Sequence, residues 1–464
     1  MSTQGDVTVG IDIGTTSVKA VAVNGAGDVV ARARVPHLMV SPTAGAFEHQ
    51  IETAWQANVH EALSHVAAGL DIAAVNVSAM VPSLGALTAD GKACSPGLLY
   101  GDYRGITETN KPGDPGDAGE LLAFLSWLTK NAPQAERFWP AQAVANHALC
   151  GAGAIESIPA MSAYPLYNGR NWDDEKLTDV GVSPESLPIV VRGAQPIGVV
   201  QGNGAAAGAL LGGGTIDAFA EQIVAGADND GDVLVICGAT LITWAVAETD
   251  NASPDGAGIW SIPHTARGKL LLGGPSNAGG IFVDRVHRWL GVSPAEPIDD
   301  INLDDLPIWL PYVRGERTPL HRRNLRAELH DLAIHHETPH LRRAIYEASG
   351  FVVRHHLDLA TRRGANPKRL VVTGGGSRSQ AWVQALADTT GLPVDTVNVP
   401  EGAALGSAFI ARCVAGLEDN ILEARRWAKV SKRVEPDARW LEHTENRYQR
   451  FLQLTLEAVE NTTA

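Results

Sequence analysis

One pattern of strand, turn and strand occurs twice in the 464-residue chain, and this repetition constrains the fold more than any other feature. In the first copy, apolar residues alternate over 7–13, as in a strand, and lead into Asp12-Ile13-Gly14-Thr15-Thr16-Ser17-Val18-Lys19. In the second copy, the apolar run 233–237 ends at Gly238-Ala239-Thr240, and residues 241–247 form the returning strand. The repetition predicts an α/β protein built from two related domains.

The segments around the two copies extend this prediction. In the first half, the glycine-containing turn 24–28 predicts a hairpin and a third antiparallel strand, followed by a helix at 51–68 and a strand at 74–78. In the second half, a buried strand at 369–373 precedes Gly374-Gly375-Gly376 and a helix. We therefore expect a two-domain, actin-like (ribonuclease H-like) ATPase fold with the active site in the interdomain cleft.

The segment Asp228-Asn229-Asp230-Gly231 fits a hinge between the two halves. The expected boundaries are then 1–228 for an N-terminal domain with the first phosphate-type turn, and 229–464 for a C-terminal domain with the second one. A chain of 464 residues is long enough for two large domains.

Composition excludes several classes of protein. The formal net charge of −15 argues against a nucleic-acid partner, although backbone amides and a metal ion can still hold ATP on an acidic protein. No apolar run approaches the ~20 residues of a membrane span, and the N-terminus lacks a signal-peptide pattern. The four cysteines are scattered, as in a reduced protein. We expect a cytoplasmic protein without a membrane partner; its oligomeric state stays open, a homodimer being compatible with the sequence.

A lone carboxylate, Asp217, lies between the two turns in the run Gly212-Gly213-Gly214-Thr215-Ile216-Asp217-Ala218-Phe219-Ala220. Glycine/threonine turns let backbone amides approach phosphate oxygens, and a carboxylate can take the proton of an acceptor alcohol, so the set fits a phosphotransferase. No G-x-x-x-x-G-K-[ST] sequence occurs, which excludes a P-loop fold. Asp217 could instead cap a helix or be a surface charge, and the first turn could be an ordinary hairpin. The order and spacing of the features together favour the catalytic interpretation.

Further strings resemble the FGGY family of carbohydrate kinases, most closely its xylulokinases, from about residue 7 to residue 454. Besides the features above, the resemblance rests on Asp102-Tyr103-Arg104, Pro311-Tyr312-Val313-Arg314-Gly315-Glu316-Arg317-Thr318-Pro319 and Glu401-Gly402-Ala403-Ala404-Leu405-Gly406-Ser407-Ala408. It implies transfer of the γ-phosphate of ATP to a hydroxyl of a small sugar, with D-xylulose favoured and with Mg²⁺ as a cofactor.

The resemblance also implies a role for each matched position. Asp217 is the general base, and Asp12 is the second catalytic carboxylate and the metal ligand. Sugar contacts fall on Met80, Val81, Asp102, Arg104 and Asp217. ATP contacts fall on Gly14, Thr15, Thr16, Ser17, Lys19, Gly238, Ala239, Thr240, Gly374, Gly375, Gly376, Ser377 and Ser379.

Two departures from the family pattern concern the acceptor. Xylulokinases usually carry Gln-Met-His-Gly in the first sugar-binding loop, where this chain has Met80-Val81-Pro82-Ser83, and the family's later Lys-Asp pair is Asn146-His147 here. Both changes fall on the acceptor side. The kinase interpretation stands, while another ketose or a polyol of the ribulose, erythritol or glycerol type remains an alternative acceptor.

Two alternatives come from other functional classes. A sugar- or nucleotide-sensing protein could have kept the fold and lost turnover, but the chain retains Asp12, Lys19 and Asp217. An actin- or chaperone-like ATPase would have no small-molecule acceptor, and the Gly-Glu-Arg-Thr-Pro segment argues against it.

Seven of the fifteen histidines lie between residues 321 and 356, and His335, His336 and His340 raise a metal hypothesis. Their spacing matches no closed zinc set, and no cysteine is nearby, so we do not expect a metal there. Glu316-Arg317 is expected to form an ion pair that braces a domain.

Overall fold

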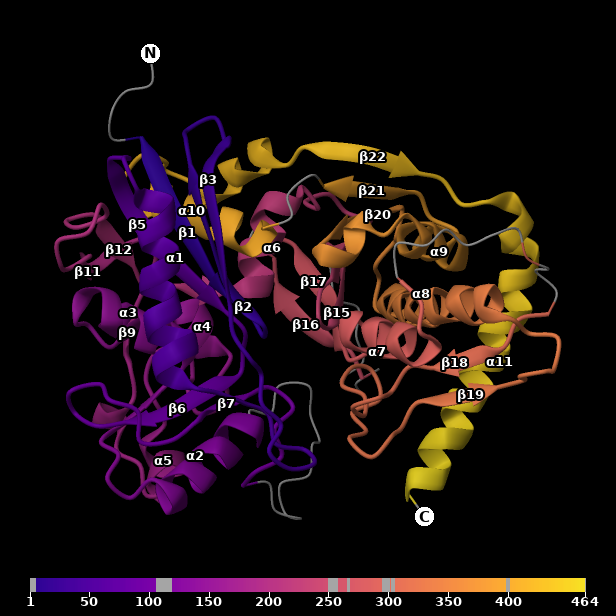
Figure 1. Ribbon diagram of the computed structural model, residues 1–464, viewed down its shortest axis with the longest axis horizontal. Coiled ribbons are helices and arrows are strands. Elements are labelled where there is room, and N and C mark those ends of the chain that lie inside the picture. The colour runs from indigo at the N-terminus through magenta and orange to yellow at the C-terminus, as the bar shows by residue number, and fades with distance from the viewer. Residues whose placement is uncertain are drawn as a thin grey trace. The chain divides into compact units, whose positions relative to one another are not determined.

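The computed structural model describes residues 6–105, 119–248, 258–264, 268–293, 301, 305–397 and 401–463. The chain divides into two compact units (Figure 1). Unit 1 consists of Met1–Val224 and Glu401–Trp427, and unit 2 consists of Ala225–Pro400 and Ala428–Ala464. The chain first crosses between units close to the expected boundary at residue 228. The later crossings differ from the expectation, because 401–427 belongs to unit 1.

Unit 1 is built on a seven-stranded mixed sheet in the order β11-β12-β5-β1-β2-β3, with β13 also paired to β5. Strands β1, β2 and β3 form the antiparallel meander that the sequence predicted, and β5 pairs parallel to β1, β12 and β13. The strands of this sheet are β1 (Val7–Ile13), β2 (Ser17–Val23), β3 (Val29–Pro36), β5 (Ile72–Ala79), β11 (Pro196–Val199), β12 (Leu210–Gly212) and β13 (Thr215–Ile216).

Two helices pack on this sheet and explain why its central strands are buried. The apolar residues of α1 face β1, β2 and β3, and α10 packs on β1 and β5. A π-helical segment, Glu52–Ala57, precedes α1 within the predicted helix 51–68. The helices of unit 1 are α1 (Asn58–Ala67), α2 (Gly119–Asn131), α3 (Ala141–Cys150), α4 (Ser157–Met161), α5 (Asp174–Asp179), α6 (Asp217–Ala225) and α10 (Gly402–Val414).

Shorter elements complete unit 1. A four-stranded sheet of order β4-β7-β6-β8 and a two-stranded sheet of β9 and β10 lie beyond the main sheet. Their strands are β4 (Glu48–His49), β6 (Ser83–Leu87), β7 (Gly97–Leu99), β8 (Arg137–Trp139), β9 (Ala154–Glu156) and β10 (Ile189–Val191). Two 3₁₀ segments cover Pro184–Ser186 and Ile421–Trp427.

Unit 2 repeats the plan of unit 1. Its seven-stranded sheet has the order β16-β17-β15-β14-β20-β21-β22, in which β14, β15 and β17 form an antiparallel meander and β20 pairs parallel to β14. The order β20-β14-β15-β17 thus corresponds to β5-β1-β2-β3, which confirms the predicted repetition. The strands are β14 (Asp232–Cys237), β15 (Leu241–Ala247), β16 (Trp260–Pro263), β17 (Leu270–Ser276), β20 (Arg369–Thr373), β21 (Val394–Val397) and β22 (Val430–Val434).

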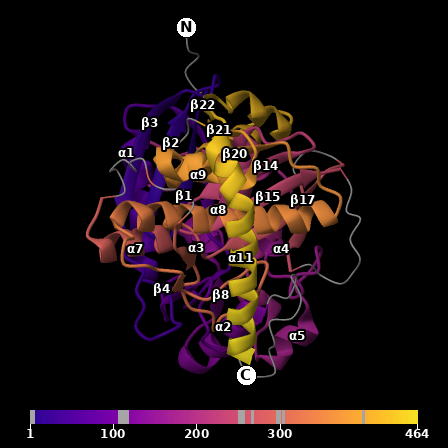
Figure 2. The same ribbon diagram turned by 90° about the vertical axis from the view of Figure 1, so that its right-hand side faces the viewer.

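Unit 2 contains α8 and α11, the two longest helices of the described part of the chain. Helix α8 packs against α9, and α11 packs against α9 and ends the chain (Figure 2). The helices of unit 2 are α7 (Gly280–Leu290), α8 (Thr338–Arg362), α9 (Gln380–Thr390) and α11 (Ala438–Thr463). A 3₁₀ turn covers Gly375–Arg378, and β18 (Ile308–Leu310) and β19 (Glu328–His330) form a two-stranded antiparallel sheet.

Each unit has its own apolar core, as two packed domains require. None of the helices in the described part of the chain is long and apolar enough to cross a membrane.

Candidate active site

Three parallel strands of unit 1 end at the same edge of the sheet. Ile13, the last residue of β1, and Ile216, the last residue of β13, both pair with Ala79 at the end of β5. The first turn, Met80 and Asp217 follow directly after these strands, so they gather at the carboxyl edge where α/β sheets usually bind ligands. Three parts that are far apart in the sequence therefore meet at one place in unit 1.

Asp12 is buried, with 6% of its surface exposed. Burial raises the pKa of Asp12, whereas the charge of Lys19 and a hydrogen bond from Ser78 act in the opposite direction. The Ser78 hydroxyl lies 3.4 Å from Oδ1 of Asp12, and Lys19 is the residue opposite Asp12 on β2. A carboxylate oxygen is the hard ligand that Mg²⁺ prefers, and a bound cation would offset the cost of burying the charge, so Asp12 fits the predicted metal role.

The turn after β1 is closed by a hydrogen bond of 3.1 Å from the amide of Gly14 to the carbonyl of Ser17. Thr15 is half-buried and Thr16 is exposed, so a ligand can reach this turn. The Ser17 side chain is buried, and its hydroxyl accepts a hydrogen bond of 3.2 Å from Nε of Arg34. The hydroxyl of Ser17 is thus engaged inside the protein, and a contact of Ser17 with ATP would have to come from its backbone.

Asp217 is the first residue of α6 and is partly exposed. Its Oδ1 accepts a hydrogen bond of 2.7 Å from the amide of Ala218. The positive end of the helix dipole favours the ionised carboxylate at this position. The residue therefore combines the exposure and the charge that a proton acceptor needs.

Three buried amide side chains hold the glycine run that leads into Asp217. Each bonds one backbone group of the run at 3.0–3.3 Å: Asn76 the amide of Gly214, Asn146 the carbonyl of Gly213, and Gln142 the carbonyl of Thr215. Asn146 thus supports the site from within the fold. Asn76 and Gln142 could not be recognised from the sequence, because one buried amide in a strand or helix leaves no pattern there.

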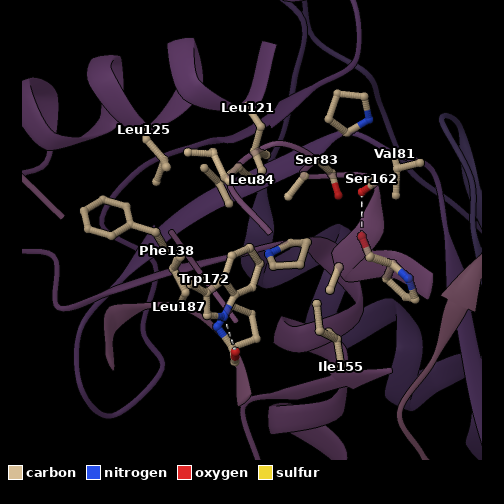
Figure 3. Close-up of a pocket in the computed structure, with 17 residues that line it drawn as sticks. Val81, Ser83, Leu84, Leu121, Leu125, Phe138, Ile155, Ser162, Trp172 and Leu187 are labelled. Carbon is tan, nitrogen blue, oxygen red and sulfur yellow. Dashed lines mark hydrogen bonds between the residues drawn. The ribbon is translucent and has the colours of Figure 1, made fainter. Parts of the chain in front are cut away.

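The loop after β5 lines an apolar pocket within unit 1 (Figure 3). Met80 is buried, while Val81 and Pro82 contribute to the pocket wall. The rest of the wall comes from apolar side chains of neighbouring elements, among them Leu84, Leu121, Leu125, Phe138, Ile155 and Leu187. The predicted sugar-binding loop therefore adjoins carbon surface where the family pattern would place an amide and an imidazole.

The polar groups in the pocket wall are bonded to the backbone. Ser83 accepts a hydrogen bond of 3.1 Å from the amide of Ala141, and Ser162 donates one of 2.6 Å to the carbonyl of Pro159. Nε1 of Trp172 donates to a backbone carbonyl at 3.1 Å. These groups are already engaged, and the cavity, at ≈ 20 Å³, has room for about one water molecule rather than for a sugar.

Asp102 and Arg104, the other predicted sugar contacts, form a compact ion-pair cluster. Asp102 is fully buried and accepts hydrogen bonds from the amide of Phe47 (2.7 Å) and from the Arg104 guanidinium (2.6 Å). Arg104 also pairs with Glu48 at 2.6 Å and lies 4.7 Å from the ring centroid of Trp127. The Asp102 carboxylate braces this loop, and its contact with a sugar stays a prediction.

Unit 2 contains a second turn at the corresponding place, between β14 and β15. The amide of Gly238 donates to the carbonyl of Thr240 at 3.0 Å, which closes a turn one residue shorter than the turn closed by Gly14 and Ser17 in unit 1. The carbonyls of Gly238 and Ala239 accept from the first amides of α7 at 2.8 and 3.1 Å. The helix N-terminus thus binds the carbonyl side of the turn.

The triple glycine follows β20, which pairs parallel to β14, so it lies at the same sheet edge as the turn at Gly238. Gly374 has φ of +80°, and a side chain there would also meet the backbone of Cys237. A Cβ on Gly376 would lie 2.7 Å from Cys237 and Trp382. At Gly375, in contrast, an added Cβ finds no atom within 4 Å. The backbone at Gly375 is therefore open to a ligand, while its neighbours are glycine for packing.

The two predicted serines after the triple glycine have local partners. The Ser377 hydroxyl donates to the carbonyl of Gly374 at 2.7 Å, and Ser379 caps α9 by accepting from the amide of Trp382 at 3.3 Å. They shape the loop, and their contact with ATP stays a prediction.

We expect Gly375→Val to weaken nucleotide binding and to leave sugar binding unchanged. The open space at Gly375 means that the branched side chain is accommodated by the fold but occupies the region where a nucleotide would approach the backbone. Calorimetry with ATP measures the effect, and Gly204→Ala, at an equally open glycine of unit 1, is the control. An unchanged ATP Kd in a folded Gly375→Val variant would contradict this placement.

Glu316 is held by hydrogen bonds, while its predicted ion pair with Arg317 stays a prediction. Its buried carboxylate accepts hydrogen bonds from the Ser276 hydroxyl (2.7 Å) and from the amides of Asn277 (2.9 Å) and Arg317 (2.6 Å). Burial raises the pKa of Glu316 to about 7, against the opposing effect of these donors. The residue ties the segment after β17 to the Gly-Glu-Arg-Thr-Pro segment inside unit 2.

This raised pKa predicts a pH-dependent stability. The folded chain binds the Glu316 proton more tightly than the unfolded chain, whose pKa is near 4.5, so this contribution is complete below pH 4.5 and is lost as the pH rises through about 7. At ~1.4 kcal/mol per pKa unit, this contribution to the free energy of unfolding is at most on the order of 3 kcal/mol. In urea titrations, the stability of the wild type relative to Glu316→Gln should fall between pH 5 and 8. A pH-independent difference would contradict the shift.

The histidine cluster is hydrogen-bonded in a way that disfavours a metal. Asp305, His335 and His336 place ligand atoms within 4.8 Å of one another. However, Nδ1 of His336 accepts a hydrogen bond of 2.9 Å from the amide of Ala333, so its Nε2 carries the proton that faces Asp305 at 3.2 Å. A protonated nitrogen cannot bind a metal ion.

Comparisons with known proteins agree with this architecture. The N-terminal domain of the FGGY family of carbohydrate kinases matches residues 7–214, and its C-terminal domain matches residues 295–415. A xylulose kinase of Streptomyces coelicolor is 30% identical over 455 residues, which cover 91% of each chain. A xylulose kinase of Escherichia coli is 26% identical over 460 residues, or 93% of this chain and 94% of that protein.

Solved structures show the same fold. A gluconate kinase from Lactobacillus acidophilus superposes with a TM-score of 0.83 at 20% identity and covers 98% of both chains. A xylulose kinase from the same organism gives 0.80 at 21% identity and covers 97% of both. The fold and the site thus define an ATP-dependent phosphotransferase with an alcohol as acceptor. The chain belongs to the FGGY family of carbohydrate kinases.

Proposed function

We propose that this kinase phosphorylates a small ketose or polyol, with D-xylulose the first acceptor to test, and that Asp217 is its general base. The observation that carries the proposal is the meeting of Asp217, the first turn and the Met80 loop at the ends of three neighbouring strands. The similarity to xylulose kinases over nearly the whole chain supports the choice of a ketopentose.

Each group at this edge has a separate role in phosphoryl transfer. Asp217 accepts the proton of the attacking hydroxyl, and the helix dipole keeps it ionised for that role. The amides of the first turn bind phosphate oxygens. Asp12 would hold Mg²⁺, which when bound neutralises charge on the phosphates. Catalysis then depends on positioning and charge rather than on a covalent intermediate.

In unit 2, we assign the nucleotide to the turn at Gly238 and to Gly374-Gly375-Gly376. The support is the open backbone at Gly375 and the repetition of the phosphate turn. We also propose a cytoplasmic location, which the four free cysteines support.

An ADP-release assay over ketoses, aldoses and polyols tests the proposal. Turnover with any of these acceptors, abolished without ATP, supports a sugar kinase. Binding of a sugar or nucleotide without turnover would instead favour the sensing protein of the same fold.

The loop Met80-Val81-Pro82-Ser83, where the family pattern has an amide and an imidazole, leads to a prediction about the acceptor. Two lost hydrogen bonds, at roughly 0.5–1.5 kcal/mol each, weaken D-xylulose binding by about 5- to 150-fold. We therefore expect a KM for D-xylulose above the usual ~1 mM range, or a preferred acceptor with fewer hydroxyls at the end that faces Val81. The measurement is kcat/KM for D-xylulose against deoxy and chain-shortened analogues.

The matched variant is Val81→Thr, which adds a hydroxyl to the wall of the pocket with little change in shape. It should shift the preference back toward the more hydroxylated acceptor. A sub-millimolar KM for D-xylulose, with clear preference over other ketoses and polyols, would contradict this prediction.

A further inference from the structure

Two histidines that the sequence analysis did not single out hold the turn after β1. Nε2 of His37 lies 3.0 Å from the carbonyl oxygen of Gly14, and Nε2 of His49 lies 2.9 Å from that of Thr15. The backbone amide of His37 donates to the carbonyl of Thr16 at 3.0 Å. All three successive carbonyls of the turn are therefore bound by these two residues.

Because the peptide bond is planar, these carbonyl contacts also determine the direction in which the neighbouring amides point. In a trans peptide, the C=O of one residue and the N–H of the next point in opposite directions. Binding the carbonyls of Gly14 and Thr15 to the imidazoles therefore turns the amides of Thr15 and Thr16 away from the rings. Among the described residues, these two amides have no hydrogen-bond acceptor. Adjacent amides that point the same way form an anion-binding concavity.

The surroundings of His49 fix its proton on the nitrogen that the turn requires. Nε1 of Trp55 donates to Nδ1 of His49 at 3.1 Å, so Nδ1 is unprotonated and Nε2 carries the hydrogen that binds Thr15. His49 is 1% exposed, and burial lowers its pKa to about 4, which keeps the ring neutral. The ring of His37 packs edge-on against His49, with centroids 4.5 Å apart.

A third contact orients the turn from its side chain. The hydroxyls of Thr15 and Tyr100 are 2.8 Å apart, and Tyr100 is 5% exposed. The conformation of Thr15 is therefore fixed at both its carbonyl and its hydroxyl, so little freedom is lost when a ligand binds the amides.

The second turn of the chain shows the same arrangement with different groups. In unit 2, the carbonyls of Gly238 and Ala239 accept hydrogen bonds from the N-terminus of α7. In unit 1, the two imidazoles bind the corresponding side of the turn. The two turns differ in length by one residue, yet each joins the first two strands of its meander and is bound on the carbonyl side by unrelated donors, which indicates that the orientation of their amides is the common requirement.

We propose that His37 and His49 are positioning residues for ATP, because by binding the turn carbonyls they hold the amides of Thr15 and Thr16 toward its phosphates. The proposal rests on the use of ATP by this kinase and on the assignment of the first turn to phosphate. The two histidines do not touch the reacting atoms themselves.

The test compares His49→Phe, which keeps a planar ring without a donor, with His49→Gln, whose amide restores both a donor toward Thr15 and an acceptor for Trp55. Calorimetry on the full chain measures binding of ATP with Mg²⁺ and of adenosine, which has no phosphate. We expect His49→Phe to weaken ATP binding at least ~10-fold, the weight of a charge-assisted hydrogen bond, and to leave adenosine binding unchanged. His49→Gln should recover most of the loss.

Equal weakening of ATP binding and adenosine binding by His49→Phe would show that His49 has only a structural role, and it would overturn the proposal. Unchanged ATP binding would also overturn it. If His49→Phe does not fold, Trp55→Phe decides, because it frees Nδ1 of His49 and lets the proton leave Nε2. It should then weaken ATP selectively over adenosine, and equal effects would overturn the proposal.

These measurements distinguish a failure of the positioning role of His37 and His49 from a failure of the proposed function. Binding of ATP and adenosine is measured without an acceptor, so the positioning role stands or falls independently of the sugar. If no acceptor is phosphorylated but the His49 variants discriminate between ATP and adenosine, the proposed function fails and the positioning role stands. If an acceptor is phosphorylated and the His49 variants do not discriminate between ATP and adenosine, the proposed function stands and the positioning role fails.

Discussion

Asp217→Asn should lower kcat by at least ~10²-fold with the best acceptor while ATP binding stays within a few-fold of the wild type. The substitution keeps the size of the side chain and its capacity to accept the hydrogen bond of the Ala218 amide, so α6 should start as before. It removes the negative charge that accepts the proton of the acceptor hydroxyl. Steady-state kinetics with the acceptor identified by the ADP-release assay measure kcat, and calorimetry measures ATP binding.

The chain offers a matched control in the same unit. Asp173 caps α5, and its side chain accepts a hydrogen bond of 3.1 Å from the amide of Lys176. Asp173→Asn therefore makes the same chemical change at another helix start, and we expect it to leave kcat unchanged. Near wild-type kcat in Asp217→Asn would show that another group takes the proton, and a loss common to both variants would point to a helix effect.

The parts of the fold that sequence reasoning predicted share one property, which is that they depend on local patterns. The alternation over β1 and the glycines after β2 are local features, and they predicted the first meander correctly. The same features recur at β14 and β15, so the repetition can be recognised from the amino-acid sequence alone. The turns at Gly14 and Gly238 follow from the same local chemistry.

Long-range packing could not be predicted from local sequence patterns. Helix α10 has the composition of a buried helix, but no pattern in its sequence says which sheet it covers, and the structure groups it with unit 1 although it follows the C-terminal part of the chain. The structure gives the reason, since a Cβ on Gly10 of β1 would lie 1.8 Å from the carbonyl oxygen of Ala404. A glycine on the strand and small residues on the helix make this close contact, and either alone is ambiguous.

The candidate site shows the same limit. Asp12 and Asp217 stand out because each carboxylate sits beside glycines and threonines. His37 and His49 have no such context, and they act on the turn through folding of the chain around it. Asp102 was noticed through the family string, which implies a sugar contact that stays a prediction, whereas its buried ion pair with Arg104 is visible only in the structure. Sequence patterns thus identified the residues at the sheet edge better than those that support it.

Gly406→Ala should destabilise the protein and lower its turnover, although the same change usually stabilises a helix by ~0.5–1 kcal/mol. Gly406 lies within α10, where a Cβ would be 1.8 Å from the carbonyl oxygen of Ala220 in α6. The helices must separate by more than 1 Å for this methyl group to reach ordinary contact at 3.4 Å. Overpacking of this kind typically costs ~1–3 kcal/mol.

The effect on turnover follows from what α6 carries. Asp217 begins this helix, so a shift of the backbone at Ala220 displaces the proposed base, and a misplacement of ~1 Å can cost ~10²-fold in rate. Urea unfolding and kcat are measured for Gly406→Ala and for the control Gly204→Ala. At Gly204 an added Cβ meets no atom within 4 Å, so the control should keep the stability and the kcat of the wild type. A Gly406→Ala variant that is more stable and fully active would show that α10 moves freely on α6. The expected loss of both would show that the position of Asp217 depends on a helix that joins unit 1 from the far end of the chain.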